Sequence, residues 1–254
     1  MEAPLAGALT TSGLRRSFRG FTAIADVSLD IPAGARHALI GPNGAGKTTL
    51  INLLTGALRP DDGEVMMDGN RITHLPQHAR VKRGLTRTFQ VNTLFASLTV
   101  LESVALAVCE RLGQGADCWR PVSAREDVLD EAYELLGSLG LDGDGGAVTR
   151  QLPYGKQRLV EIALALAARP SVLLLDEPAA GIPSGESQQL IATIERLPAE
   201  TTILLIEHDM SLVFRFAQRI TVLAAGSVVT EGTPDAVAAD ARVRELYLGG
   251  EGHA

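Results

Sequence analysis

The stretch Gly41-Pro42-Asn43-Gly44-Ala45-Gly46-Lys47-Thr48-Thr49 decides the fold of this chain. It follows the apolar run at residues 38–40 and precedes residues 50–54, Leu-Ile-Asn-Leu-Leu, so the local order is strand, glycine-rich loop, helix. In that order, the pattern G-x-x-x-x-G-K-[ST] predicts a phosphate-binding loop. Glycines let successive backbone N–H groups point inward, and the positive end of the helix dipole faces the phosphates. An ordinary glycine-rich turn would lack these flanking elements.

The last residues of this loop predict its ligands. Lys47 is placed to bridge the β and γ phosphates of a nucleoside triphosphate, and the Thr48 hydroxyl can take a coordination position on Mg²⁺. All nine residues, 41–49, are expected to line the nucleotide site. The loop alone leaves the reaction open, because nucleotide kinases, GTPases, helicases and transport ATPases share it.

The pattern along the rest of the chain predicts an α/β fold with a largely parallel sheet. Short apolar runs alternate with stretches of helical spacing; the runs lie at residues 38–40, 172–175, 203–206 and 220–223. Residues 98–169 have helical periods and glycine-rich joints but no strand pattern, so we expect a helical subdomain inserted into a core of residues 1–97 and 170–254. Antiparallel strands are expected at residues 18–31 and 225–230.

The composition restricts the cellular setting and the partners. The chain has 254 residues, 46% of them hydrophobic, which is enough for a buried core. No apolar run approaches the roughly 18 residues of a membrane span, and the start lacks the pattern of a secretory signal, so we expect a cytosolic chain. Its 30 acidic and 23 basic residues give a net charge of −7, which disfavours nucleic acid as a partner. Cys109 and Cys118 are expected to be reduced structural thiols.

Two carboxylates follow a second apolar run. Residues 172–175 lead directly into Asp176 and Glu177, and Pro178 ends the strand. The carboxyl ends of strands are where α/β proteins place their chemistry. Asp176 is expected to hold the Mg²⁺ shell, while Glu177 orients and polarises a water for in-line attack on the γ-phosphate. The alternative is a strand that merely ends in solvated acids.

Three further residues have candidate roles that depend on their place in the series. His208 follows the apolar run 203–206, where it can contact the γ-phosphate and hold the attacking water in register with Glu177. Gln90 lies between the loop and the helical segment, where its amide can ligate Mg²⁺ or the attacking water. Phe18, beside three arginines, is the best candidate for stacking on adenine; Phe21 competes with it, and core packing is the alternative for Phe18.

Residues 152–158, Leu-Pro-Tyr-Gly-Lys-Gln-Arg, resemble the signature sequence of ABC ATPases, usually L-S-G-G-Q-Q-R. With this segment, the order of loop, glutamine, signature, acidic pair and histidine covers nearly the whole chain. The resemblance implies a P-loop ABC ATPase core with an antiparallel β edge and an inserted helical subdomain. It also implies a head-to-tail dimer, in which the signature residues Tyr154, Gly155 and Lys156 of one subunit close over ATP bound to the other. The second subunit is either the same chain or a paralogue.

Five passages are similar to the ATP-binding subunits of branched-chain amino acid importers: residues 84–90, 94–100, 176–181, 206–210 and 247–249. This resemblance implies an ATPase that powers uptake of branched-chain or related small amino acids. Its implied partners are transmembrane permeases at the cytoplasmic face of the inner membrane and, indirectly, an extracytoplasmic solute-binding protein. Residues 75–80 are also similar to the lipopolysaccharide-export ATPase, so export stays open. Further alternatives are a soluble ABC protein and a P-loop kinase in which residues 152–158 form an unrelated loop.

Two prolines depart from the family pattern. Pro153 stands in place of the signature serine, which removes a hydroxyl and a backbone N–H, although proline suits the first turn of a helix. Pro183 stands where many relatives carry the aspartate of the loop after the acidic pair. We expect the ATP site completed by this signature to lose a hydrogen bond unless Lys156 compensates by its charge.

Overall fold

The computed structural model describes residues 7–88, 97–114 and 125–248. The chain divides into two compact units: residues 1–86, 171–177 and 198–254 form the first, and residues 87–170 and 178–197 form the second. The second unit therefore includes residues 178–197 as well as the segment 98–169 expected from the sequence. Gln90 and Cys118 lie outside the described residues.

A six-stranded sheet is the framework of the first unit. Its strand order is β10 (Ser227–Gly232), β9 (Arg219–Ala224), β3 (Arg36–Ile40), β8 (Thr202–Ile206), β7 (Val172–Asp176) and β6 (Leu85–Arg87). The pairs β9/β3, β3/β8 and β8/β7 are parallel, whereas β10 runs antiparallel to β9. Every residue of β7 and β8 is buried, as expected for strands covered on both faces. The predicted parallel sheet is confirmed, and β3 lies in its interior.

A second, antiparallel sheet has the order β2 (Phe21–Ile31), β1 (Leu9–Phe18), β4 (Asp62–Met67) and β5 (Asn70–Arg71). Strands β1 and β2 are joined by Arg19 and Gly20, which both have positive φ angles, 47° and 88°. Such a two-residue turn matches the twist of paired strands. The sequence indicated a strand only from residue 18 onward. Strand β1 was therefore not predicted, because its middle is polar and contains Gly13.

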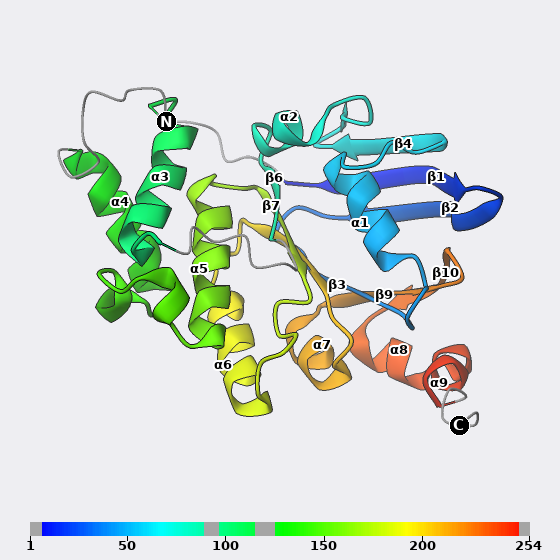
Figure 1. Cartoon of the computed structure of the whole chain (residues 1–254). Helices are drawn as coiled ribbons and strands as arrows, with labels where there is room; N and C mark the ends of the chain where they lie inside the picture. The colour runs from blue at the N-terminus through cyan, green and yellow to red at the C-terminus, as the bar shows by residue number, and fades with distance from the viewer. Residues whose placement is uncertain (1–6, 89–96, 115–124, 249–254) are drawn as a thin grey trace. The chain divides into compact units, whose positions relative to one another are not determined.

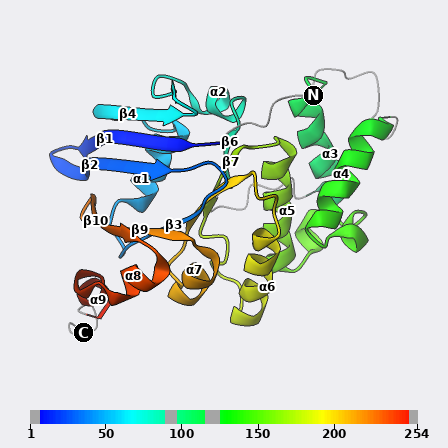
Figure 2. The same ribbon diagram turned by 180° about the vertical axis from the view of Figure 1, so that it is seen from behind.

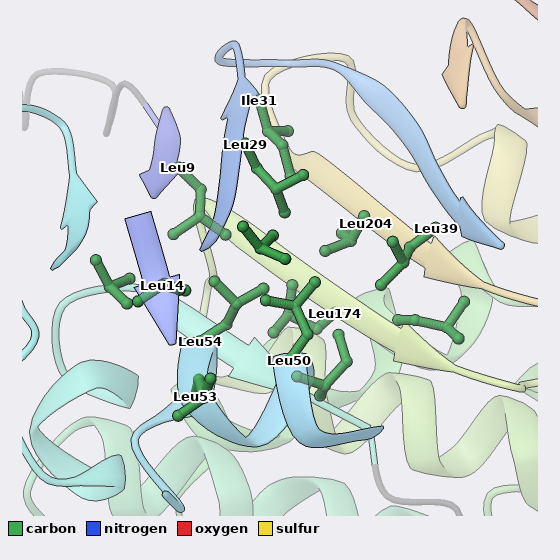
Figure 3. Packing of buried hydrophobic residues seen from close by; sticks show 14 of the residues in the cluster. Leu9, Leu14, Leu29, Ile31, Leu39, Leu50, Leu53, Leu54, Leu174 and Leu204 are labelled. Carbon is green, nitrogen blue, oxygen red and sulfur yellow. The ribbon is translucent and has the colours of Figure 1, made fainter. Parts of the chain in front are cut away.

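Helix α1 (Lys47–Thr55) packs its apolar side chains into the main core of this unit. Leu50, Ile51, Leu53 and Leu54 are fully buried. They belong to a core that includes residues of both sheets, such as Leu14 and Leu174, and Figure 3 shows Leu50, Leu53 and Leu54 within it. Burying one such side chain contributes about 1.5–3 kcal/mol. This packing fixes the helix that follows the glycine-rich loop.

The short helix α2 (Gln77–Val81) is tied to the end of α1 by one arginine. Arg80 is 1% exposed. Its guanidinium donates hydrogen bonds to the carbonyls of Leu53 at 2.8 Å and Leu54 at 2.5 Å in the last turn of α1, and to those of Thr73 and Leu75. Burial lowers the pKa of Arg80 to about 10. A cation at this end of α1 also complements the helix dipole.

The C-terminal part of the first unit contains, besides β9 and β10, the helices α7 (Met210–Phe216), α8 (Pro234–Ala239) and α9 (Ala241–Leu248). Asp209 caps α7 by accepting a hydrogen bond from the Ser211 N–H, and the Thr233 hydroxyl caps α8. Helix α8 packs against β9 and β10, and α9 against α8 and β10 (Figure 1).

The second unit is helical. Figure 2 shows its helices α3 (Val100–Arg111), α4 (Glu126–Ser138), α5 (Tyr154–Ala167) and α6 (Ser184–Glu195), with short 3₁₀ turns at Asp142–Asp144 and Thr149–Gln151. A capping box formed by Thr99 and Glu102 starts α3. Helix α5 begins five residues before the helical period at 159–168 that the sequence indicated, directly after Pro153. Over the described ranges, no helix combines the length and the apolar character needed to cross a membrane.

Candidate functional site

The loop between β3 and α1 is held by close backbone contacts at its glycines. A Cβ atom on Gly41 would lie 2.1 Å from the carbonyl oxygen of Leu223, so no side chain fits there. Gly46 is the N-cap of α1 with a φ of 103°, a left-handed conformation that glycine adopts without strain. The first N–H groups of α1 have no partner within the helix, and they therefore form a site for an anion.

Lys47 is held by the loop itself. Its Nζ donates hydrogen bonds to the carbonyl oxygens of Gly41 at 2.6 Å and Pro42 at 3.1 Å. Burial lowers the pKa of Lys47, while the charges of Glu177 and Asp176 act in the opposite direction. The ammonium is thus fixed above the loop and partly removed from water, where its attraction for a phosphate is stronger than at the surface.

A cleft of about 330 Å³ opens over this loop. It is lined by Ala23, Glu177, two aromatic residues and the loop residues Asn43, Gly44, Ala45, Gly46, Lys47, Thr48 and Thr49. The aromatic residues are Phe18 and Phe21, which are 39% and 67% exposed and face each other across the β1–β2 hairpin. The guanidinium of Arg16 lies 4.8 Å from the centroid of the Phe18 ring. The cleft therefore offers an aromatic wall for a base and an N–H-rich floor for phosphates.

The wall and the floor of the cleft meet at Ala23 of β2. A Cβ on either Gly46 or Gly226 would lie 2.6 Å from the carbonyl oxygen of Ala23. Gly226, in the β9–β10 turn, also donates its N–H to the Ala45 carbonyl and accepts from the Ala25 N–H, at 2.9 and 2.8 Å. Three segments of the first unit are thereby joined through backbone contacts that leave no space for side chains.

The acidic pair lies where the sequence placed it, at the carboxyl end of β7. Asp176 is 5% exposed and Glu177 is half-buried. Glu177 has a φ of 46°, in the left-handed region that costs a non-glycine residue energy, and its N–H donates to the Ile206 carbonyl of β8 at 2.9 Å. Strained backbone that the surrounding structure holds in place is typical of functional positions.

His208 follows β8 as expected, and 65% of its side chain is exposed. Its Nδ1 lies 3.8 Å from Oε2 of the buried Glu207. A different histidine, His37 of β3, is buried, and its Nε2 pairs with the Thr221 hydroxyl at 2.8 Å. His37 carries no functional assignment, and burial lowers its pKa.

The segment that resembles a signature belongs to the helical unit. Tyr154 and Gly155 are the first two residues of α5, so their N–H groups lack partners within the helix. The Tyr154 hydroxyl accepts a hydrogen bond from Arg158 at 2.6 Å. The Lys156 ammonium pairs with both oxygens of Asp144, at 2.8 and 2.7 Å. The positive charge of Lys156, which was expected to compensate for the hydrogen bond lost at Pro153, is therefore already balanced by Asp144.

Comparison with known proteins identifies the family. The profile of the ABC transporter family matches residues 24–180, and that of the branched-chain amino acid ATP-binding cassette transporters matches residues 227–253. The chain belongs to the ABC transporter family. It is an ATPase of that family.

Full-length relatives and solved structures agree with this assignment. The high-affinity branched-chain amino acid transport ATP-binding proteins LivG of Escherichia coli and BraF of Pseudomonas aeruginosa are both 37% identical to this cassette. The alignments cover 98% of this chain and 99% of LivG, and 95% of this chain and 97% of BraF. The crystal structure of an ABC-transporter ATP-binding cassette in its ADP conformation superimposes with a TM-score of 0.83 at 29% identity, covering 95% and 98% of the two chains. The predicted fold class is confirmed.

Two features of the cleft over the phosphate loop were incompletely predicted. Phe21 was named only as a competitor of Phe18, yet both line the cleft. Their positions flanking a two-residue turn could have indicated this, because directly opposed residues of a hairpin share one face. The contacts of Gly226 come from the far end of the chain, and nothing in the local sequence predicts them.

Proposed function

We propose that this chain is the ATP-hydrolysing motor subunit of an ABC importer that takes up branched-chain or related small amino acids. The main support is the combination of the cleft over the phosphate loop with the C-terminal match to branched-chain amino acid cassettes. The two full-length relatives named above carry the same function in their names. By this proposal the chain works at the cytoplasmic face of the membrane, bound to permease subunits that receive solute from an extracytoplasmic binding protein.

Within one subunit, residues that line the cleft and residues outside its lining, such as His208, divide the work on ATP. Phe18 stacks on adenine, the backbone of residues 41–49 holds the phosphates, and Lys47 neutralises their charge. Glu177 orients and polarises the attacking water, and His208 keeps that water in line with the γ-phosphate. Gln90, outside the described residues, would act as a further polar ligand near this water.

The oxygen donors at the end of β7 and the start of α1 fit Mg²⁺. Thr48 offers an exposed hydroxyl in the first turn of α1, and Asp176 a buried carboxylate whose charge acts on Lys47. Few protein ligands suffice, because Mg²⁺ in nucleotide sites keeps several waters and binds phosphate oxygens. When bound, the ion neutralises charge that develops on the phosphates during transfer.

We propose further that hydrolysis needs a second cassette. The unpaired N–H groups of Tyr154 and Gly155 at the start of α5, with Lys156 beside them, would face the γ-phosphate of ATP bound to the other subunit. ATP then stabilises the closed dimer, and its cleavage opens it. The second subunit is either another copy of this chain or a paralogue.

A dimerisation experiment tests this composite site. Glu177→Gln should bind ATP without hydrolysing it, so the variant should dimerise in ATP and Mg²⁺, alone or with its partner ATPase, as measured by light scattering on a sizing column. The matched control adds Lys47→Ala, which should keep the variant monomeric. A Glu177→Gln protein that stays monomeric even beside its partner ATPase would refute the composite site.

The transport assignment is tested on the intact complex. A tagged chain purified from membranes should bring polytopic permease subunits with it, and branched-chain amino acids with their binding protein should stimulate ATP hydrolysis in reconstituted vesicles. Co-purification without stimulation by any such amino acid would contradict the substrate class but leave the motor function standing.

Pro153 offers a separate test of the signature. Since α5 has no side-chain cap at Pro153 and Lys156 is paired with Asp144, Pro153→Ser should add a hydrogen bond worth about 1–3 kcal/mol at the partner's ATP site. Turnover of the assembled transporter should therefore rise. Unchanged turnover would show that the missing hydroxyl has no role.

A further inference from the structure

The segment that resembles a signature has a tyrosine where the usual pattern has a glycine. When L-S-G-G-Q-Q-R is aligned with residues 152–158, its first glycine corresponds to Tyr154. Glycine would leave this position of α5 without a side chain, whereas Tyr154 adds a ring that is 41% exposed. A ring at the start of a helix can cover the N–H groups that an approaching phosphate needs. The contacts that hold the Tyr154 ring therefore bear on the proposed composite site.

Arg158, one turn further along α5, binds the hydroxyl of this tyrosine. Its Nη2 donates a hydrogen bond to the Tyr154 hydroxyl at 2.6 Å, and its guanidinium carbon lies 5.0 Å from the centroid of the Tyr154 ring. Residues four apart are neighbours on one face of a helix. The ring is thus held along the side of α5 by its hydroxyl and by its face.

Glu161 fixes Arg158 in turn. Nη1 of Arg158 donates to Oε2 of Glu161 at 2.7 Å, and the two side chains are 4% and 8% exposed. Separating such a pair would leave two charges buried without each other, so the guanidinium has little freedom to leave its position. Hydrogen bonds therefore link the buried face of α5, through Arg158, to the first residue of the helix.

Gly181 lies against the ring from the other side. It belongs to the loop that precedes α6 and has a φ of 76°. A Cβ on Gly181 would lie 3.4 Å from Cε1 of Tyr154 and 3.9 Å from its hydroxyl oxygen. Both residues belong to the second unit. The ring therefore lies beside α5, against this loop, and does not extend over the end of the helix.

We propose that Arg158 and Glu161 are positioning residues of the composite site: they hold the Tyr154 ring against Gly181 and so keep the first turn of α5 open to the ATP of the other subunit. The proposal rests on the proposed ATP-dependent dimer of two cassettes. It goes beyond that dimer because it assigns to one ion pair the accommodation of a tyrosine at a glycine position.

The alternative is that these side chains only stabilise the helical unit. The two roles differ in what happens once the tyrosine is removed. If Arg158 and Glu161 only stabilise the fold, their loss does equal harm with either residue at position 154. If they hold the ring aside, Tyr154→Gly removes what they must hold, and their loss no longer affects dimerisation.

The test measures ATP-dependent dimerisation of Glu177→Gln chains, alone or beside the partner ATPase, by light scattering on a sizing column. Arg158→Met with Glu161→Met replaces the ion pair by apolar side chains, so that no buried charge is left without its partner. We expect this double change to weaken dimerisation about two- to tenfold per composite site, the range of a net hydrogen bond. Added to the Tyr154→Gly chain, it should cause no further loss.

Two further variants complete the design. Tyr154→Phe removes only the hydroxyl and keeps the ion pair, so it tests the same point with the buried network intact; it should also weaken dimerisation. Arg111→Met with Glu131→Met removes another ion pair of the helical unit and should leave dimerisation unchanged. ATP binding to the monomer should be the same in all these chains, because the cleft over the phosphate loop lies in the first unit.

Equal losses from the double change in the Tyr154 and Tyr154→Gly chains would overturn the proposal, because the ion pair would then act on the fold alone. Unchanged dimerisation of Tyr154→Phe would overturn it as well. If the Glu177→Gln parent failed to dimerise even beside its partner ATPase, the composite site itself would fail. The failure of this inference and that of the proposed function are thus distinguishable.

Discussion

Arg80 permits the sharpest test of how the phosphate-loop helix is held. In Arg80→Met, an apolar side chain of similar length replaces the guanidinium, and four backbone carbonyls each lose one hydrogen bond, although that of Leu53 keeps the Gly56 N–H as a donor. Each hydrogen bond to a charged group contributes about 1.5–3 kcal/mol, and leaving a buried acceptor unsatisfied has a cost of similar size. The desolvation that lowers the pKa of Arg80 to about 10 offsets part of this. We therefore expect a net loss of about 3–5 kcal/mol, typical of breaking a buried charged network.

The measurement is thermal and denaturant unfolding of the full chain. For a chain of this size, about 2–4 °C of Tm is lost per kcal/mol, so Arg80→Met should melt about 6–20 °C lower. Arg80→Lys, which keeps the charge but not the planar fork, should lie between this variant and the wild type. The control is Arg83→Met, an exposed arginine nearby, whose stability should stay within about 0.5 kcal/mol of the wild type.

The reasoning on Arg80 would be wrong if Arg80→Met melted within about 2 °C of the wild type at an unchanged denaturant slope. That result would mean that water or a rearranged α2 satisfies the carbonyls of α1. ATP affinity measured well below the melting range should change little, because Arg80 contacts the end of α1 opposite the loop.

Three further predictions concern the cleft and the buried histidine. Lys47→Ala should reduce ATP hydrolysis at least about 100-fold with little change in Tm, as phosphate-release assays would show, whereas Lys82→Ala, at an exposed site, should not. Phe18→Ala and Phe21→Ala should each weaken ATP binding about two- to tenfold and leave tripolyphosphate binding unchanged; equal losses for both ligands would argue against stacking. Burial lowers the pKa of His37, so the unfolded chain takes up a proton at a higher pH than the folded chain does. The unfolding free energy should then fall as the pH drops below about 6.5, by at most about 1.4 kcal/mol per pH unit, and His37→Val should lack this component.

Local patterns carried most of what the sequence could predict. The strand, loop and helix around Lys47 and the strand that ends at Asp176 are encoded in contiguous residues, so their periodicity and glycines suffice. Strand β1 was missed because its pairing with β2 and β4 stabilises it, not an apolar alternation of its own. The predicted start of helix α5 was too late in the sequence because the turn after Pro153 is polar. A proline directly before the first turn nevertheless favours a helix start there.

Contacts between distant parts of the chain could not be predicted. The strained backbone of Glu177 depends on its bond to Ile206 in the neighbouring strand. The pairing of Lys156 with Asp144 likewise arises only after folding. A single sequence contains no local signal for such long-range contacts.

The junction at Ala23 has a consequence for which molecules the cleft accepts. Because Gly46 and Gly226 bring β2, the phosphate loop and the β9–β10 turn together through backbone alone, the spacing between the backbone of β2 and the loop is fixed. Side-chain rotation cannot lengthen or shorten it. If the cleft binds ATP as we propose, the nucleotide must therefore fit a fixed distance between β2 and the phosphate loop.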